Sequence, residues 1–206
     1  MPVNPTKQPR ESLAEILARH CTEILGGLEG PSAAVLDPRT SGGLLACFGH
    51  LATRASTPLA PSSGMELEPP VAEICRRLIA YFGVDPRLRG ALLLGGLKWL
   101  VDHYGEGVAA AAEALSENEV RVLELDDEVP SARDAVQYAI IALGLVGVAV
   151  PDDSLDDLRR WDAELRRVLP GVILQLRAQG WSQKWRAATH PPWMWRRVLA
   201  EKFDPS

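Results

Sequence analysis

The sequence predicts an all-α protein: an irregular multi-helix bundle with a C-terminal helical segment rich in tryptophan and arginine. Helix-start signals recur along the 206 residues, and the apolar residues between them fall mostly at spacings of three and four. The alternating apolar and polar runs that are typical of strands are missing from the sequence. Apolar residues make up 47% of the chain, which is enough for a core without help from metals or disulfides.

Serine and proline mark the expected helix starts. Ser12 and Ser116 each precede a glutamate by three residues, which is a capping box, and Ser131 and Ser154 precede an aspartate in the same place. Pro86 suits the first turn of a helix. We therefore expect helices at Ser12–Leu25, about Gly42–Ala55, Pro70–Phe82, Pro86–Tyr104, Gly107–Leu115, Glu117–Leu125, Ala132–Val150, Leu155–Ala178 (a break near Pro170 and Gly171 being an open alternative) and Pro192–Phe203.

Composition divides the chain into four parts. Residues 56–69 are rich in proline and serine and read as a linker between an N-terminal helical arm, residues 1–55, and a main helical bundle, residues 70–180. Residues 181–206 form the Trp/Arg-rich C-terminal docking segment. The longest apolar run, Ala135–Val150, is shorter than the ~20 residues that a bilayer needs. It predicts a buried helix and no membrane partner.

The three cysteines indicate the cellular compartment of the protein, and the charge distribution indicates the kind of partner that it binds. We expect Cys21, Cys47 and Cys75 to be buried free thiols of a cytoplasmic protein, because each lies in an apolar helical context and the chain opens without a signal peptide. The net charge of -5 hides an asymmetry, since residues 159–206 carry +6 and the remainder carries -11. Such asymmetry favours a partner of opposite sign or docking of the two parts on each other.

The stretch Leu36–Leu45 has the sequence LDPRTSGGLL, which resembles a segment near the C-terminal end of selenophosphate synthetases. The resemblance covers these residues alone, and we carry no site residue over from that family. A Thr-Ser-Gly-Gly turn before an apolar run also predicts an ordinary helix start, with Thr40 or Ser41 as its cap.

Catalytic and metal sites are the weaker interpretations of this sequence. His20, Cys21, Cys47 and His50 could supply four zinc ligands, but adjacent positions on a helix point about 100° apart. Asp152–Asp157 holds four carboxylates that could bind Mg²⁺, although acids also suit a helix start. We expect no cofactor and no bound metal, and a carboxylate-based metal-dependent enzyme remains an alternative.

The segment Gly107–Glu124 has the rhythm of a helix-turn-helix, with a break at Leu115–Ser116. Its second helix would carry Glu117, Glu119 and Glu124 with Arg121 as the single base, which is the wrong sign for a phosphate backbone. DNA reading by this segment is therefore excluded, and an acidic solvated face or a landing site for a basic partner is expected.

The C-terminal segment is the main functional signal. Gly180–Arg197 holds four of the six tryptophans and five basic residues, counting His190, with no acid. Tryptophan and arginine dominate protein-interface hot spots, and they also form surfaces for single-stranded nucleic acid. We expect a non-catalytic adaptor subunit of a larger assembly; the alternatives are a nucleic-acid-binding accessory subunit and a tail docked on its own core. The candidate partner-binding residues are Trp181, Trp185, Arg186, Trp193, Trp195, Arg196 and Arg197.

Overall fold

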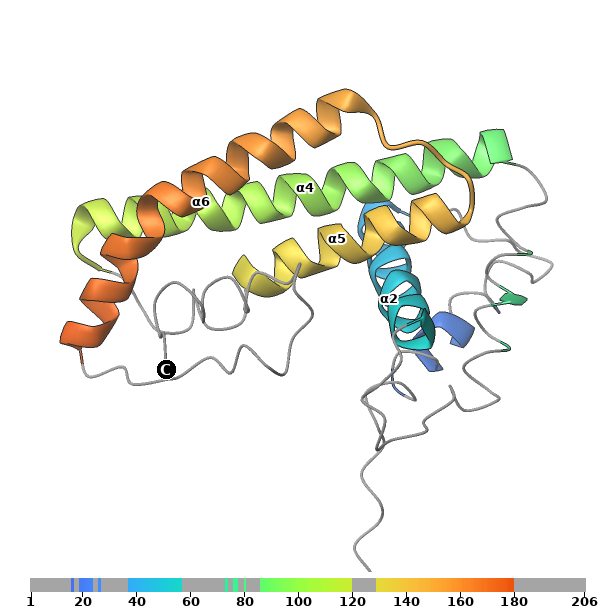
Figure 1. The fold of residues 1–206 in the computed structure, drawn as a ribbon, viewed down its shortest axis with the longest axis horizontal. Helices are drawn as coiled ribbons and strands as arrows, with labels where there is room; N and C mark the ends of the chain where they lie inside the picture. Colours follow the sequence, from blue (N-terminus) through green and yellow to red (C-terminus); the bar gives the residue numbers. More distant parts are fainter. Residues whose placement is uncertain are drawn as a thin grey trace, which may run out of the picture.

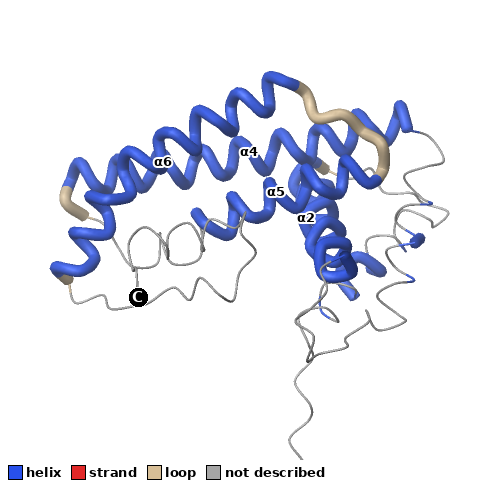
Figure 2. The backbone as a smooth tube through the Cα atoms, viewed as in Figure 1, coloured by secondary structure: helices blue, strands red, loops and turns tan. Residues whose placement is uncertain are grey.

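The computed structural model describes residues 16, 19–23, 26, 37–56, 73, 76–77, 80, 86–119 and 129–179. These residues contain helices and no strand, which confirms the all-α prediction (Figure 2). Four helices are complete within them: α2 (Pro38–Ser56), α4 (Pro86–Glu117), α5 (Val129–Leu145) and α6 (Asp152–Ala178).

Helix α4 lies at the centre of the arrangement. It contacts α2, α5 and α6, and α2 also contacts α5. Figure 1 shows α5 and α6 on different sides of α4, with α2 crossing near one end. Helices α4 and α6 run in the same direction and α5 runs in the opposite one. One apolar core joins all four helices, and its largest fully buried side chains are Tyr104, Phe48, Leu44, Leu45, Leu51, Leu93, Leu97 and Leu143.

Helix α2 begins earlier than the sequence pattern predicted. Its cap is Asp37, whose carboxylate accepts bonds from the Thr40 N–H at 3.0 Å and the Thr40 hydroxyl at 2.7 Å. These bonds, the backbone one first, hold the pKa of Asp37 below its ordinary value. Pro38 follows at the first helical position, where a missing N–H costs nothing. The prediction of Thr40 or Ser41 as the cap was therefore wrong, because both residues lie inside the first turns.

Helix α4 is continuous where two helices and a break were expected. It passes through Tyr104–Gly107 without interruption and ends at Glu117. Asn118 then adopts a left-handed conformation (φ 59°), and the Glu119 N–H donates to the Ala114 carbonyl at 2.9 Å. This is a Schellman end. Ser116 was wrongly expected to start a helix; its hydroxyl instead donates to the Glu113 carbonyl in the last turn.

The starts of α5 and α6 also precede their predicted caps. Helix α5 begins at Val129, so Ser131 lies inside it. It ends at Leu145 rather than at the predicted Val150, because Gly147 (φ 72°) forms a second Schellman end. Helix α6 begins at Asp152, ahead of Ser154, and its N-terminus has no side-chain cap. Asp152 and Asp153 stand in its first turn, where the helix dipole favours negative charge.

Proline 170 does not break α6, which runs on to Ala178. Figure 1 shows this helix bending toward its C-terminal end. A proline inside a helix removes one N–H donor and crowds the preceding turn, which bends the axis without ending the helix.

Glycines allow α2 to approach its neighbours at backbone distance. A Cβ on Gly42 would lie 2.8 Å from the Gly96 carbonyl oxygen of α4, and the Ser41 hydroxyl donates to the Leu92 carbonyl at 3.0 Å. Farther along α2, a Cβ on Gly49 would collide with the backbone of Tyr138 in α5. The Thr-Ser-Gly-Gly stretch therefore makes a helix crossing.

The division into arm, linker, bundle and docking segment remains a prediction. Helix α2, which belongs to the expected arm, shares its buried side chains with α4 and α5. The described residues of the expected helices Ser12–Leu25 and Pro70–Phe82 are helical. The expected helix Pro192–Phe203, the linker beyond Ser56 and most of Glu117–Leu125 lie outside the described residues.

Over the described ranges, no helix combines the length and the apolar character that crossing a bilayer requires. The part of the apolar run up to Leu145 belongs to α5, whose inner side chains pack into the core.

Glycine 49 tests the close crossing of α2 and α5. Gly49→Ala should lower the free energy of unfolding by about 1–3 kcal/mol, because the added methyl group meets backbone that cannot rotate away. Gly43→Ala is the matched control, since a Cβ there meets nothing within 4 Å and the substitution should stabilise α2 by about 1 kcal/mol. Urea unfolding followed by circular dichroism measures both. Equal effects of the two variants would contradict the crossing.

Candidate functional site

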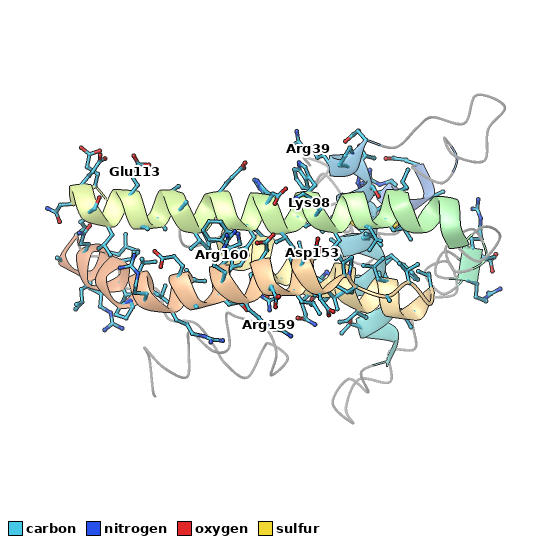
Figure 3. All side chains as sticks on the ribbon, turned by 90° about the horizontal axis from the view of Figure 1, so that it is seen from above. Arg39, Lys98, Glu113, Asp153, Arg159 and Arg160 are labelled. Carbon is cyan, nitrogen blue, oxygen red and sulfur yellow. The ribbon has the colours of Figure 1, made fainter. Side chains whose placement is uncertain are left out.

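The exposed side of α6 is the most distinctive surface of the described residues. One side of this helix is buried against the core through Leu158, Leu165, Val168, Leu169, Val172, Ile173 and Leu176. Exposed residues on the opposite side include five arginines, one carboxylate and three apolar residues, and together they are called here the α6 outer face: Asp156, Arg159, Arg160, Ala163, Arg166, Arg167, Pro170, Leu174 and Arg177. Figure 3 shows Arg159 and Arg160 on this helix. Leu174 is 67% exposed, more than any other large apolar side chain described.

Three of these arginines are paired with carboxylates one turn earlier. The distances are 2.7 Å for Arg159 to Asp156, 3.1 Å for Arg160 to Asp157, and 2.8 Å from Arg167 Nε to Glu164 Oε2. The Arg167 hydrogen bonds hold the pKa of Glu164 below its ordinary value. The guanidinium groups are thus held over the helix surface with much of their charge already compensated.

Tryptophan 161 of α6 makes a contact between helices. Its indole lies directly on Gly105 of α4, in the space that a Cβ would occupy. The Arg160 guanidinium sits over the ring at 4.8 Å from its centroid, a cation–π geometry. Gly105, which lies between the expected helices Pro86–Tyr104 and Gly107–Leu115, is therefore required inside α4 for packing.

A buried polar network holds α6 to both α4 and α5. Asp162 accepts a bond from the Tyr104 hydroxyl at 2.9 Å and two bonds from Arg133, at 2.9 Å from Nε and 3.2 Å from Nη2. Tyr104 is completely buried, and the Arg133 and Asp162 side chains are 12% and 14% exposed. Arg133 Nη1 also donates to Gln137 at 3.4 Å. The three charged or polar groups come from three different helices, so the network fixes their mutual register.

Burial raises the pKa of Tyr104, and the charge and hydrogen bond of Asp162 raise it further. Arg133 and Arg166 act in the opposite direction but do not cancel the rise. Tyr104 therefore remains a neutral donor to Asp162 at every physiological pH.

The C-terminal end of α6 is tied to the acidic end of α4. Gln175 donates through Nε2 to the Leu115 carbonyl at 3.2 Å, and Gly171 makes room for the Leu115 side chain. Gln175 Oε1 is buried without a hydrogen-bond partner. Near Leu115, three glutamates are exposed: Glu113 and Glu117 of α4, and Glu119 just after its end. The chain thus leaves α6 next to an acidic patch.

The predicted partner-binding residues lie outside the described residues. These are Trp181, Trp185, Arg186, Trp193, Trp195, Arg196 and Arg197. Sequence reasoning missed Leu174 and the Arg133–Asp162 pair. A helical projection would have found Leu174, since it falls off the apolar stripe of α6; no sequence signal pairs Arg133 with Asp162 across two helices.

The candidate metal ligands do not converge within the part of the chain that the structure describes, where no group of three or more His, Cys, Asp or Glu side chains could hold one ion. Asp156 and Asp157 bind arginines instead. His50 stacks on Tyr138 at 4.5 Å, and His20 is exposed while its neighbour Cys21 is buried.

The side chains of Cys21 and Cys47 are neighbours in the fold. Neither is in a disulfide, Cys47 is only partly buried, and Cys75 lies outside the described residues.

Removing one partner of the buried pair should be costly, whereas removing the whole network should not. Arg133→Met should lower the free energy of unfolding by about 3–5 kcal/mol, because Asp162 is left as an unpaired buried carboxylate. Adding Asp162→Leu and Tyr104→Phe should restore most of this loss. Denaturant unfolding measures each variant. The matched control is Arg159→Met, which breaks an exposed pair and should change stability by less than about 0.5 kcal/mol.

Tyrosine 104 should give the protein a stability loss in alkali. Its pKa in the folded state lies above the ordinary value of about 10, so its contribution is complete below pH 10 and is lost as the pH rises further. Tyr104→Phe lacks this contribution. The gap in unfolding free energy between the two proteins should therefore shrink above about pH 10. Urea unfolding at a series of pH values measures the gap, and a gap that stays constant or widens would contradict the buried neutral tyrosine.

No protein-family model, no curated protein and no solved structure matches this chain. The α6 outer face directly precedes the Trp/Arg-rich segment in the sequence.

Proposed function

We propose that this protein is a non-catalytic helical interaction subunit of a larger assembly, and that it binds a protein partner through the α6 outer face and the Trp/Arg-rich segment that follows it. The observation that carries the proposal is Leu174. A large apolar side chain that is 67% exposed, one turn from exposed Pro170, is uncovered in the isolated chain. Exposed apolar groups within a polar rim are typical of surfaces that another protein covers.

The surroundings of Leu174 match the anatomy of an interface. An apolar residue with arginines along the same side of its helix resembles a hot spot, in which the apolar centre is desolvated and the guanidinium groups make directional bonds to acceptors. Arg167 lies two turns before Leu174 and Arg177 one turn after it, on the same side of the helix. The partner that fits is a protein surface with an apolar pocket for Leu174 and carboxylates or carbonyls around it.

Nucleic acid is the second candidate, supported by the +6 charge of residues 159–206. The ion pairs of α6 argue against it as the first choice. A phosphate would have to displace Asp156, Asp157 and Glu164 from their arginines, and those carboxylates would remain nearby with the wrong sign. A protein partner can accommodate both signs of charge on one surface.

The proposal predicts that Leu174→Glu abolishes partner binding and leaves the fold intact. The substitution removes the apolar centre of the interface, while at an exposed position it should change stability by less than about 0.5 kcal/mol. The measurement is quantitative co-purification from the native host, with thermal unfolding as the fold check. Leu145→Glu is the matched control, because Leu145 is 48% exposed at the end of α5.

A partner retained by wild type and Leu145→Glu, and lost by both Leu174→Glu and the double variant Trp193→Ala with Trp195→Ala, would support the proposal. A partner retained by Leu174→Glu would exclude the α6 outer face. Unfolding of the tryptophan double variant would instead assign that pair to the core. Fluorescence anisotropy with labelled single- and double-stranded DNA and RNA tests the nucleic-acid alternative. If the protein binds a nucleic acid with an affinity that falls steeply with salt, and truncation after Gly180 abolishes this binding, then nucleic acid is the partner and the proposed protein partner is wrong.

A further inference from the structure

Two cysteines that are distant in the sequence meet in the fold. The side chain of Cys21, from residues 19–23, lies next to the thiol of Cys47 in α2, close enough to influence its pKa. Both side chains join the same apolar core, and neither is in a disulfide. Figure 1 shows residues 19–23, drawn in blue, beside α2. Cys21 is the buried side chain of that short stretch, in which Arg19, His20, Thr22 and Glu23 are exposed.

The two thiols differ in accessibility and in acidity. Cys21 is completely buried, whereas Cys47 is partly exposed. The hydrogen bond from Cys21 lowers the pKa of Cys47, against the opposing effect of burial. Because the thiolate is the reactive form, Cys47 is the thiol that a reagent in solution can reach and that can attack it. Cys21 is placed to react next.

We propose that Cys21 and Cys47 are a redox modification site, which low-molecular-weight disulfides convert reversibly into a protein disulfide joining residues 19–23 to α2. Cys47 is the attacking thiol and Cys21 the resolving thiol. The site takes its oxidising equivalents from a disulfide of the glutathione class.

The chemistry is two successive thiol–disulfide exchanges. The Cys47 thiolate attacks one sulfur of the oxidised reagent, the reagent's S–S bond breaks, and one reagent thiolate departs. The Cys21 thiol then gives up its proton, and its sulfur attacks the Cys47 sulfur and releases the second reagent thiol. Two protein thiols are oxidised and one external disulfide is reduced to two thiols, so electrons and protons balance.

The oxidised form should be the more stable one. A link between residues 21 and 47 restricts the unfolded chain, which favours the folded state. It would also fasten to α2 a segment whose described contact with the core is made through Cys21. A rise in melting temperature that a reducing agent reverses is therefore the expected physical consequence.

The experiment treats the full chain with oxidised glutathione and then maps the cysteines by mass spectrometry under denaturing, non-reducing conditions. Wild type should lose two of its three titratable thiols and yield a linked Cys21–Cys47 peptide without retained glutathione. Cys75→Ser is the matched control and should behave in the same way. Cys21→Ser should stop at the mixed disulfide on Cys47, and Cys47→Ser should take up no glutathione at buried Cys21.

Three results would overturn the proposal: wild type that keeps all its thiols, wild type that keeps glutathione on Cys47 with Cys21 still reduced, or a disulfide that includes Cys75. These readings come from the wild-type chain, so they stand even if a cysteine variant fails to fold. The melting temperature of oxidised wild type, with and without dithiothreitol, is the second measurement, and no reversible rise would contradict the link between the two segments.

Discussion

The pairing of Arg133 with Asp162, closed by Tyr104, is the interaction on which the rest of the structure depends. It is a charge pair at the meeting of α4, α5 and α6, with both side chains almost entirely removed from water. A one-residue slip of α6 would rotate Asp162 by about 100°, and a one-turn slip would move it by about 5.4 Å. Either change leaves a buried charge unpaired, at a cost of several kcal/mol. The network therefore fixes the register of α6 and, with it, the direction in which Leu174 points.

The apolar contacts of α6 cannot fix that register by themselves. Leu158, Leu165 and Val172 recur at a spacing of seven, so a shift of seven residues would place similar side chains against α4. The polar network and the contact of Trp161 with Gly105 occur once each and break this degeneracy. The glycine is as specific as the ion pair, since the indole fits only where α4 has no Cβ. The register of α6 is thus specified by a few side chains that fit at one position only, whereas most of the stability comes from the broad apolar surface.

The sequence predicted the fold class, the start of α4 and the end of α6 at Ala178, but it placed the starts of the other helices wrongly. Pro86 was expected in a first turn and begins α4. The starts of α5 and α6 were placed late because serines three residues ahead of an acid were taken as caps, and the start of α2 was placed late because the Thr-Ser-Gly-Gly turn was taken as its beginning, whereas Asp37 is its cap. The break expected around Gly105 is absent because tertiary packing overrides local propensity. The Arg133–Asp162 pair joins residues 29 apart on different helices, and the meeting of Cys21 with Cys47 likewise depends on tertiary structure that no local pattern encodes.

Helix α4 separates the two surfaces for which roles are proposed. Its 32 residues span about 48 Å. It meets α2 near Gly96 and the C-terminal part of α6 near Leu115, which places these contacts about 28 Å apart along its axis. The thiol pair belongs to the α2 end, and the α6 outer face extends toward the other end (Figure 1). A disulfide at Cys21 and Cys47 therefore constrains a different part of the fold from the part in which Leu174 lies. The redox site and the interaction surface consequently stand on separate structural grounds, and the failure of either proposal leaves the physical argument for the other unchanged.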